Sequence, residues 1–139
     1  MPPAPDASPA WFGGMVASAA LDPLVSNVEA GGGSSCRGAA GSSTAFAAAA
    51  LAVRTGRPVL LVVAHLDEAD EAAQELAGLA AGGAPLDVAH LPALEALPGE
   101  SVAAADLLAE RLAVVRRLVE GDAPRVTVAA LSSLRPWTR

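Results

Sequence analysis

The chain has 139 residues, enough for one domain at most, and its 15 acidic and 9 basic residues give a net charge of −6. This acidic balance argues against autonomous binding to a nucleic-acid backbone, and the single Cys36 excludes an internal disulfide. The longest apolar run, residues 45–53, is too short to span a bilayer, so we expect no membrane partner, and the lone cysteine suits the reducing cytoplasm that we expect.

The N-terminal third is rich in Pro, Ala and Gly. We expect residues 1–20 to be a disordered or weakly ordered leader, because they have little to bury. A short helix is predicted over residues 21–30, where Asp22 suits the N-cap and Pro23 the first helical position. The following GGGSSCR is predicted to be a loop, with a trace of strand at residues 35–37.

The next stretch, GAAGSSTAF at residues 38–46, keeps part of the glycine scaffold of a phosphate-binding loop, with Ser43 where the second glycine belongs, but lacks its chemistry. On the template G-x-x-x-x-G-K-[ST], Thr44 stands where the lysine belongs and Ala45 where the metal-binding hydroxyl belongs. The chain contains no lysine at all, so no other alignment can supply one. We therefore expect a vestigial phosphate loop that binds no nucleotide, metal or cofactor. Its residues are Gly38, Gly41, Ser42, Ser43 and Thr44.

Helix is predicted over residues 43–55, with Gly56 placed to end it. Residues 59–63 form a continuous apolar run, which is typical of a parallel strand covered on both faces. A helix over residues 66–83 and a strand over residues 86–90 follow. The DEAD sequence at residues 67–70 invites comparison with the magnesium-binding carboxylate of helicases. It follows the loop helix too soon for that role, and we interpret it as an acidic first helical turn.

Three side chains are candidates for nucleophilic or metal chemistry. His65 and His90 each end a predicted strand, where α/β proteins place ligands, and Cys36 precedes the vestigial loop. None has a partner at a recognisable metal-ligand spacing, so we expect no catalytic or metal role for them.

The most regular helix is predicted over residues 103–120, after a Pro-bounded connector at residues 91–100. Its stripe of Leu108, Leu112, Val115 and Val119 has Leu107, Val114 and Leu118 beside it. We expect Leu108, Leu112 and Val115 to face the sheet and to supply a large share of the core. With a last strand over residues 125–131, the pattern predicts an α/β fold with a small, incomplete parallel sheet and flanking helices, its far side poorly covered.

In this order, GAAGSSTAF, PVLLVVAHLDEADEAAQEL, LEALPGE, LLAERLAVVRRL and PRVTVAAL resemble the N-terminal segment of bacterial transcription-repair coupling factors. That segment is itself similar to the first domain of the excision-repair helicase subunit UvrB. The resemblance covers residues 21–134 and implies a partial UvrB-like domain with a degenerate P-loop NTPase-like fold. Residues 135–139 depart from the family pattern, which we interpret as a truncated or frameshifted tail.

Coupling factors release RNA polymerase stalled at DNA lesions, translocate on DNA with ATP and recruit UvrA. The resemblance implies contacts with UvrA, RNA polymerase and DNA through parts of the parent protein that this chain lacks, and none for the isolated chain. We expect a non-catalytic scaffold or interaction module rather than an enzyme. The alternatives are a small stand-alone P-loop-like nucleotide-binding protein and a gene fragment that does not fold stably.

Overall fold

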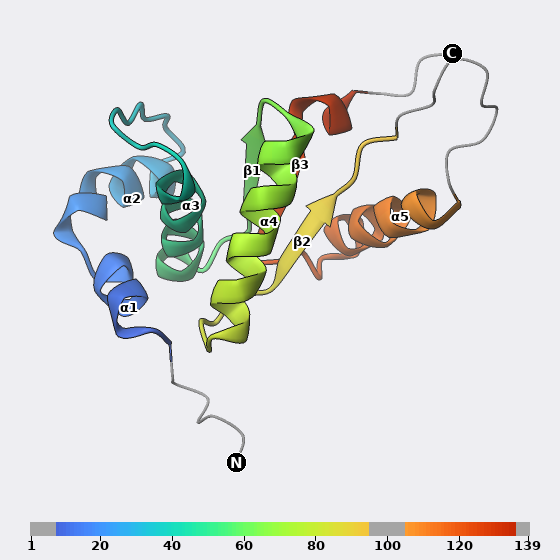
Figure 1. The fold of residues 1–139 in the computed structure, drawn as a ribbon. Helices are drawn as coiled ribbons and strands as arrows, with labels where there is room; N and C mark the ends of the chain where they lie inside the picture. Colours follow the sequence, from blue (N-terminus) through green and yellow to red (C-terminus); the bar gives the residue numbers. More distant parts are fainter. Residues whose placement is uncertain (1–7, 95–104, 136–139) are drawn as a thin grey trace.

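The computed structural model describes residues 8–94 and 105–135. These residues form one mixed arrangement of helices around a short sheet (Figure 1). The elements are α1 (Ala10–Val16), η1 (Ala19–Leu21), α2 (Asp22–Glu29), α3 (Ser42–Thr55), β1 (Val59–Val63), α4 (Leu66–Ala81), β2 (Val88–Leu91), α5 (Ala105–Glu120), β3 (Val126–Ala130) and η2 (Leu131–Leu134).

The sheet has the strand order β1-β3-β2, and both pairings are parallel. In the register, Leu61 lies opposite Val128, and His90 lies opposite the same residue from the other side. All five residues of the central strand β3 are buried, which explains its continuous run of small and β-branched side chains. The expected α/β class with a small open parallel sheet and flanking helices is confirmed.

One face of the sheet is covered by α3 and α4 and carries most of the core (Figure 1). Both helices contribute chiefly alanines, among them Ala49 and Ala72, so they pack closely on the strands. Leu76 of α4 is the largest aliphatic side chain in this core that is fully buried. Gly56 adopts the left-handed conformation (φ 66°) that ends α3, as the sequence predicts.

The opposite face is covered only in part, by α5. Val114 is the buried residue of this helix, and it packs with Leu91 and Ala129. Two arginines on the same side of α5 tether it to the two ends of β2. Arg111 donates to the carbonyl oxygen of Pro92 at 2.9 Å, and Arg117 pairs with the carboxylate of Asp87.

The prediction for the apolar stripe of α5 is wrong. Leu108, Leu112 and Val115 are 37%, 58% and 37% exposed, so they do not supply the core. The helix carries two adjacent apolar stripes, and it docks through the one that contains Val114. The two docking arginines share that side, and their contacts with β2 favour this rotation of the helix.

The leader also differs from expectation, because residues 10–16 fold as α1. Phe12 is 1% exposed, and α1 packs against α3. Trp11 makes an edge-to-face contact with Phe46 of α3, with ring centroids 5.2 Å apart. Two neighbouring aromatic side chains supply the apolar area that the expectation of disorder overlooked. Residues 1–7 lie outside the described part of the chain.

Residues 35–37 form no strand, so none leads into the vestigial loop within the described residues. Most of the connector that includes LEALPGE and nearly all of the tail at residues 135–139 lie outside the described residues. Within the described ranges, no helix combines the length and apolar character that crossing a membrane requires.

Candidate functional site

The vestigial loop lies at the carboxyl edge of the sheet, where α/β proteins place their ligands. It leads into α3 beside a hollow of about 390 Å³ that reaches the end of β1 and residues 68–75 of α4. Gly38 and Gly41 have positive φ angles of 90° and 55°, so the backbone there requires glycine. A Cβ at either position would meet no atom within 4 Å, so these glycines serve the turn rather than close contact.

The amide groups of Ala40, Ser43 and Thr44 are engaged with the loop itself. The Ala40 amide donates to the hydroxyl of Ser43 at 2.9 Å, and that hydroxyl donates to the Ala40 carbonyl at 2.7 Å. The amides of Ser43 and Thr44 donate to the carbonyls of Ala40 and Gly41 at 3.3 and 3.2 Å. A phosphate cradle needs such amides to point at the ligand, whereas these close a turn at the start of α3.

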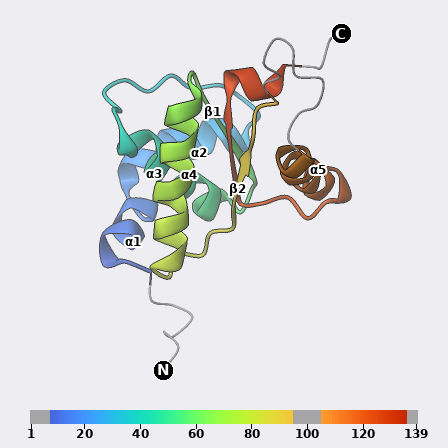
Figure 2. The same cartoon turned by 45° about the vertical axis from the view of Figure 1, so that its right-hand side comes forward.

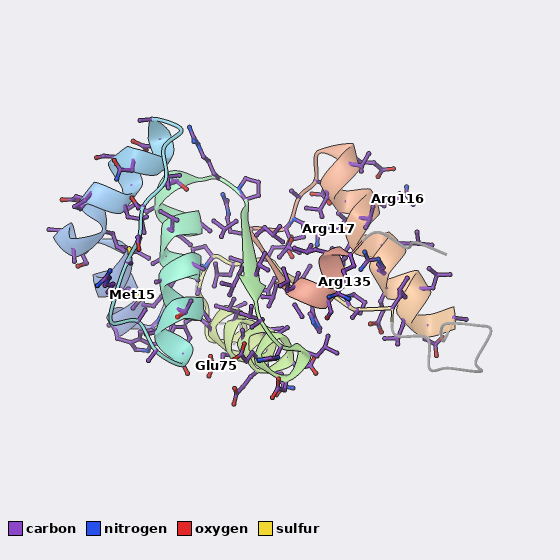
Figure 3. All side chains as sticks on the ribbon, turned by 90° about the horizontal axis from the view of Figure 1, so that it is seen from above. Met15, Glu75, Arg116, Arg117 and Arg135 are labelled. Atoms are coloured by element: carbon purple, nitrogen blue, oxygen red, sulfur yellow. The ribbon has the colours of Figure 1, made fainter. Side chains whose placement is uncertain are left out.

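A carboxylate lies beside the start of this helix. The hydroxyl of Ser42, in the first turn of α3, donates to Oε1 of Glu75 at 2.5 Å. Figure 3 shows Glu75 extending from α4 beside the end of α3. A negative charge near a helix N-terminus is stabilising, so the Glu75 carboxylate favours the start of α3 through its charge and through its hydrogen bond with the Ser42 side chain.

Two further carboxylates, those of Glu68 and Glu71, line the same hollow, together with apolar Leu61 and Val63. No lysine or arginine is among its lining residues. Three carboxylates near one another repel an anion, so the electrostatics of the hollow oppose phosphate binding.

The acidic residues at the start of α4 stabilise the first turn of that helix. The amide of His65, the N-cap residue, donates to Oε2 of Glu68 at 3.3 Å, which is half of a capping box. Asp67 and Glu68 lie in the first turn, where the macrodipole favours negative charge. Asp70 turns to the other side of α4 and lies 3.5 Å from Nδ1 of His90.

The structure places the other candidate residues in different elements. Cys36 is exposed in the loop before α3, His65 caps α4, and His90 lies within β2. Within the described residues, no three His, Cys, Asp or Glu side chains gather closely enough to hold a metal ion.

Sequence reasoning missed Glu71 and Glu75 as members of the site. The signal was present, because Glu68, Glu71 and Glu75 are spaced by three and four residues and therefore share one side of α4. That acidic stripe borders the buried stripe of Ala69, Ala72 and Leu76, which brings it to the rim of the hollow.

The arrangement can therefore hold a helix N-terminus in place, and its charge opposes an anionic ligand. Comparison of the chain with protein-family models, with curated proteins and with solved structures finds no match.

Proposed function

We propose that this chain is a non-catalytic scaffold or interaction module related to the N-terminal segment of transcription-repair coupling factors. In such a protein, polymerase release, DNA translocation and UvrA recruitment depend on other segments. The present segment then contributes a folded surface and no nucleotide chemistry.

The observation that carries the proposal is the hydrogen bond from Ser42 to Glu75 at the start of α3. A loop that keeps part of the glycine scaffold of a nucleotide site has one of the chain's own carboxylates hydrogen-bonded to a side chain in the first turn of its helix. This arrangement supports a structural role for the loop. It also agrees with the degenerate loop that the family resemblance implies.

The rival proposal is a small stand-alone nucleotide-binding protein, and calorimetry with Mg-ATP separates the two. We expect no dissociation constant below about 1 mM, which corresponds to roughly 4 kcal/mol of binding. A tighter constant for the unaltered chain contradicts the non-catalytic proposal and favours the rival.

A gain-of-function control tests whether the loop backbone is still usable. The triple variant Thr44→Lys, Ala45→Thr, Glu75→Gln restores the lysine and the hydroxyl and removes the competing charge. If the triple variant binds phosphate measurably and the unaltered chain does not, the three changed side chains account for the absence of phosphate binding.

A further inference from the structure

The outer edge of β2 presents main-chain groups that no described strand pairs. The amide of Val126 donates to the carbonyl of Asp87 at 3.1 Å, so the peptide groups of Asp87 and Ala89 point toward β3. Successive peptide groups of a strand point to opposite sides. The N–H and C=O groups of Val88 and His90 therefore point outward from the sheet.

Beside this edge, the α4 face is hollowed. A groove of about 320 Å³ is lined by Val88 and His90 of β2 and by one side of α4. Ala73 and Ala77, one helical turn apart, form its floor on the helix and leave room for the side chains of another segment. Asp70 and Gln74 give it a polar rim.

On the other face, α5 carries a partly exposed apolar side chain near its N-terminal end. Leu107 lies seven residues from buried Val114, so both share the docking side of α5, yet Leu107 is 39% exposed. Figure 2 shows β2 between α4 on one side and α5 on the other. Among the described strands the sheet therefore ends at β2, with the groove on its α4 face and partly exposed Leu107 on the α5 side.

We propose that the β2 edge binds an extended peptide segment of a partner as a fourth strand, by β-augmentation. The main chain of the segment pairs with Val88 and His90. Its side chains alternate between the two faces of the strand, so aliphatic side chains enter the groove over Ala73 and Ala77 and the intervening ones face Leu107. A lysine or arginine beside Asp70 complements the acidic rim and the net charge of −6.

The β1 edge is a weaker candidate for the same role. Its outward peptide groups belong to Leu60 and Val62, because the amide of Val59 donates toward β3. Leu60 and Val62 are 52% and 41% exposed, so an added strand there has little cover on that face of the sheet. The two edges therefore provide a matched comparison.

The inference deepens the proposed interaction role, and it rests on that proposal only because it treats the chain as a binding module.

The test uses the full chain and an end-blocked heptapeptide, Arg-Val-Thr-Val-Thr-Val-Arg. Its control is the same peptide N-methylated at alternate residues, which removes strand pairing and keeps the side chains. We expect binding of the first peptide only, with amide chemical shifts changing at residues 88–91. No binding at about millimolar peptide, equal binding of both peptides, or shifts centred on residues 59–63 overturns the proposal.

Variants at the two edges then locate the site. Val88→Pro removes one outward N–H, and Ala77→Leu fills the groove on an exposed position of α4. Each should weaken binding at least about tenfold, whereas Leu60→Pro at the other edge should leave it unchanged. Circular dichroism verifies that each variant is folded, and Ala77→Leu decides the outcome if Val88→Pro is not. Unchanged affinity in Ala77→Leu overturns the proposal. If the chain instead dimerises with increasing concentration and the amides at residues 88–91 shift in the same way, the edge binds a second copy of the chain, and the proposal of a partner peptide is overturned.

Discussion

Truncation of Leu76 should destabilise the fold far more than truncation of Leu112, although both are leucines on amphipathic helices. Leu76 is fully buried between α4 and the sheet, whereas Leu112 is 58% exposed on α5. Helical periodicity alone ranks Leu112 among the core residues, so this pair separates the docking observed in the structure from the one predicted by the sequence.

The magnitudes follow from burial. Removal of a fully buried leucine side chain typically costs about 2–5 kcal/mol, a large part of the roughly 5–15 kcal/mol that stabilises a small domain. Full burial of a leucine is worth about 1.5–3 kcal/mol, and Leu112 realises less than half of it, so Leu112→Ala should cost about 1 kcal/mol or less. Val114→Ala, on the docking side of the same helix, should cost about 1–2 kcal/mol.

Urea unfolding followed by far-UV circular dichroism measures all three variants against the unaltered chain. The expected order of destabilisation is Leu76→Ala, then Val114→Ala, then Leu112→Ala. If Leu112→Ala is as destabilising as Leu76→Ala, α5 docks through the other stripe and the placement of this helix is refuted. If the unaltered chain shows no cooperative transition, the folded module itself is refuted.

Three further predictions concern other parts of the molecule. Glu75→Gln should lower stability by about 1 kcal/mol in chemical denaturation, because the start of α3 loses a charged acceptor for Ser42; no change would mean that the contact is not formed. Phe12→Ala should cost about 3 kcal/mol or more, and an effect near zero would show that α1 does not pack as described. Hydrogen bonding to Asp87 raises the pKa of Arg117. A raised pKa contributes stability that is lost only as the pH rises through the pKa of the folded state. The difference in melting temperature between the unaltered chain and Arg117→Ala should therefore not shrink between about pH 7 and pH 10. If this difference disappears by pH 10, the pairing is contradicted.

Much of the fold could be predicted from local patterns. The continuous apolar run at residues 59–63 and the acidic start and glycine end of the helix at residues 66–83 require no tertiary information, and the structure has both elements. The strand at residues 126–130 was predicted with one extra residue at each end. These elements are specified by residues close in sequence, and their parallel pairing follows from the alternation of helix and strand.

The rotation of α5 could not be predicted in the same way. Its two apolar stripes are adjacent and equally regular, so the choice depends on what the sheet presents to the helix. Leu91 and Ala129 receive Val114, and Asp87 lies within reach of Arg117. These contacts join residues far apart in the chain, and periodicity contains no information about them.

The candidate site shows the same division. The missing lysine could be read directly from the sequence, and the positive φ angles of Gly38 and Gly41 fit a glycine-dependent turn. The role of Glu75 depends on α4 crossing beside the start of α3, which the sequence does not specify. The sequence spacing places Glu75 on the acidic side of α4, but it gives no indication of the partner Ser42, which lies 33 residues away in the chain.

The most direct test of the central claim is an amide chemical-shift titration of residues 38–44 with Mg-ATP and, separately, with pyrophosphate. Because the Glu75 carboxylate already lies at the start of α3 and repels an anion, the amides of Gly41, Ser42 and Thr44 should not shift in a saturable way below about 1 mM ligand. In Glu75→Gln, pyrophosphate should perturb them more than in the unaltered chain. Saturable shifts of these amides in the unaltered chain, with a dissociation constant well below about 1 mM, would contradict the account.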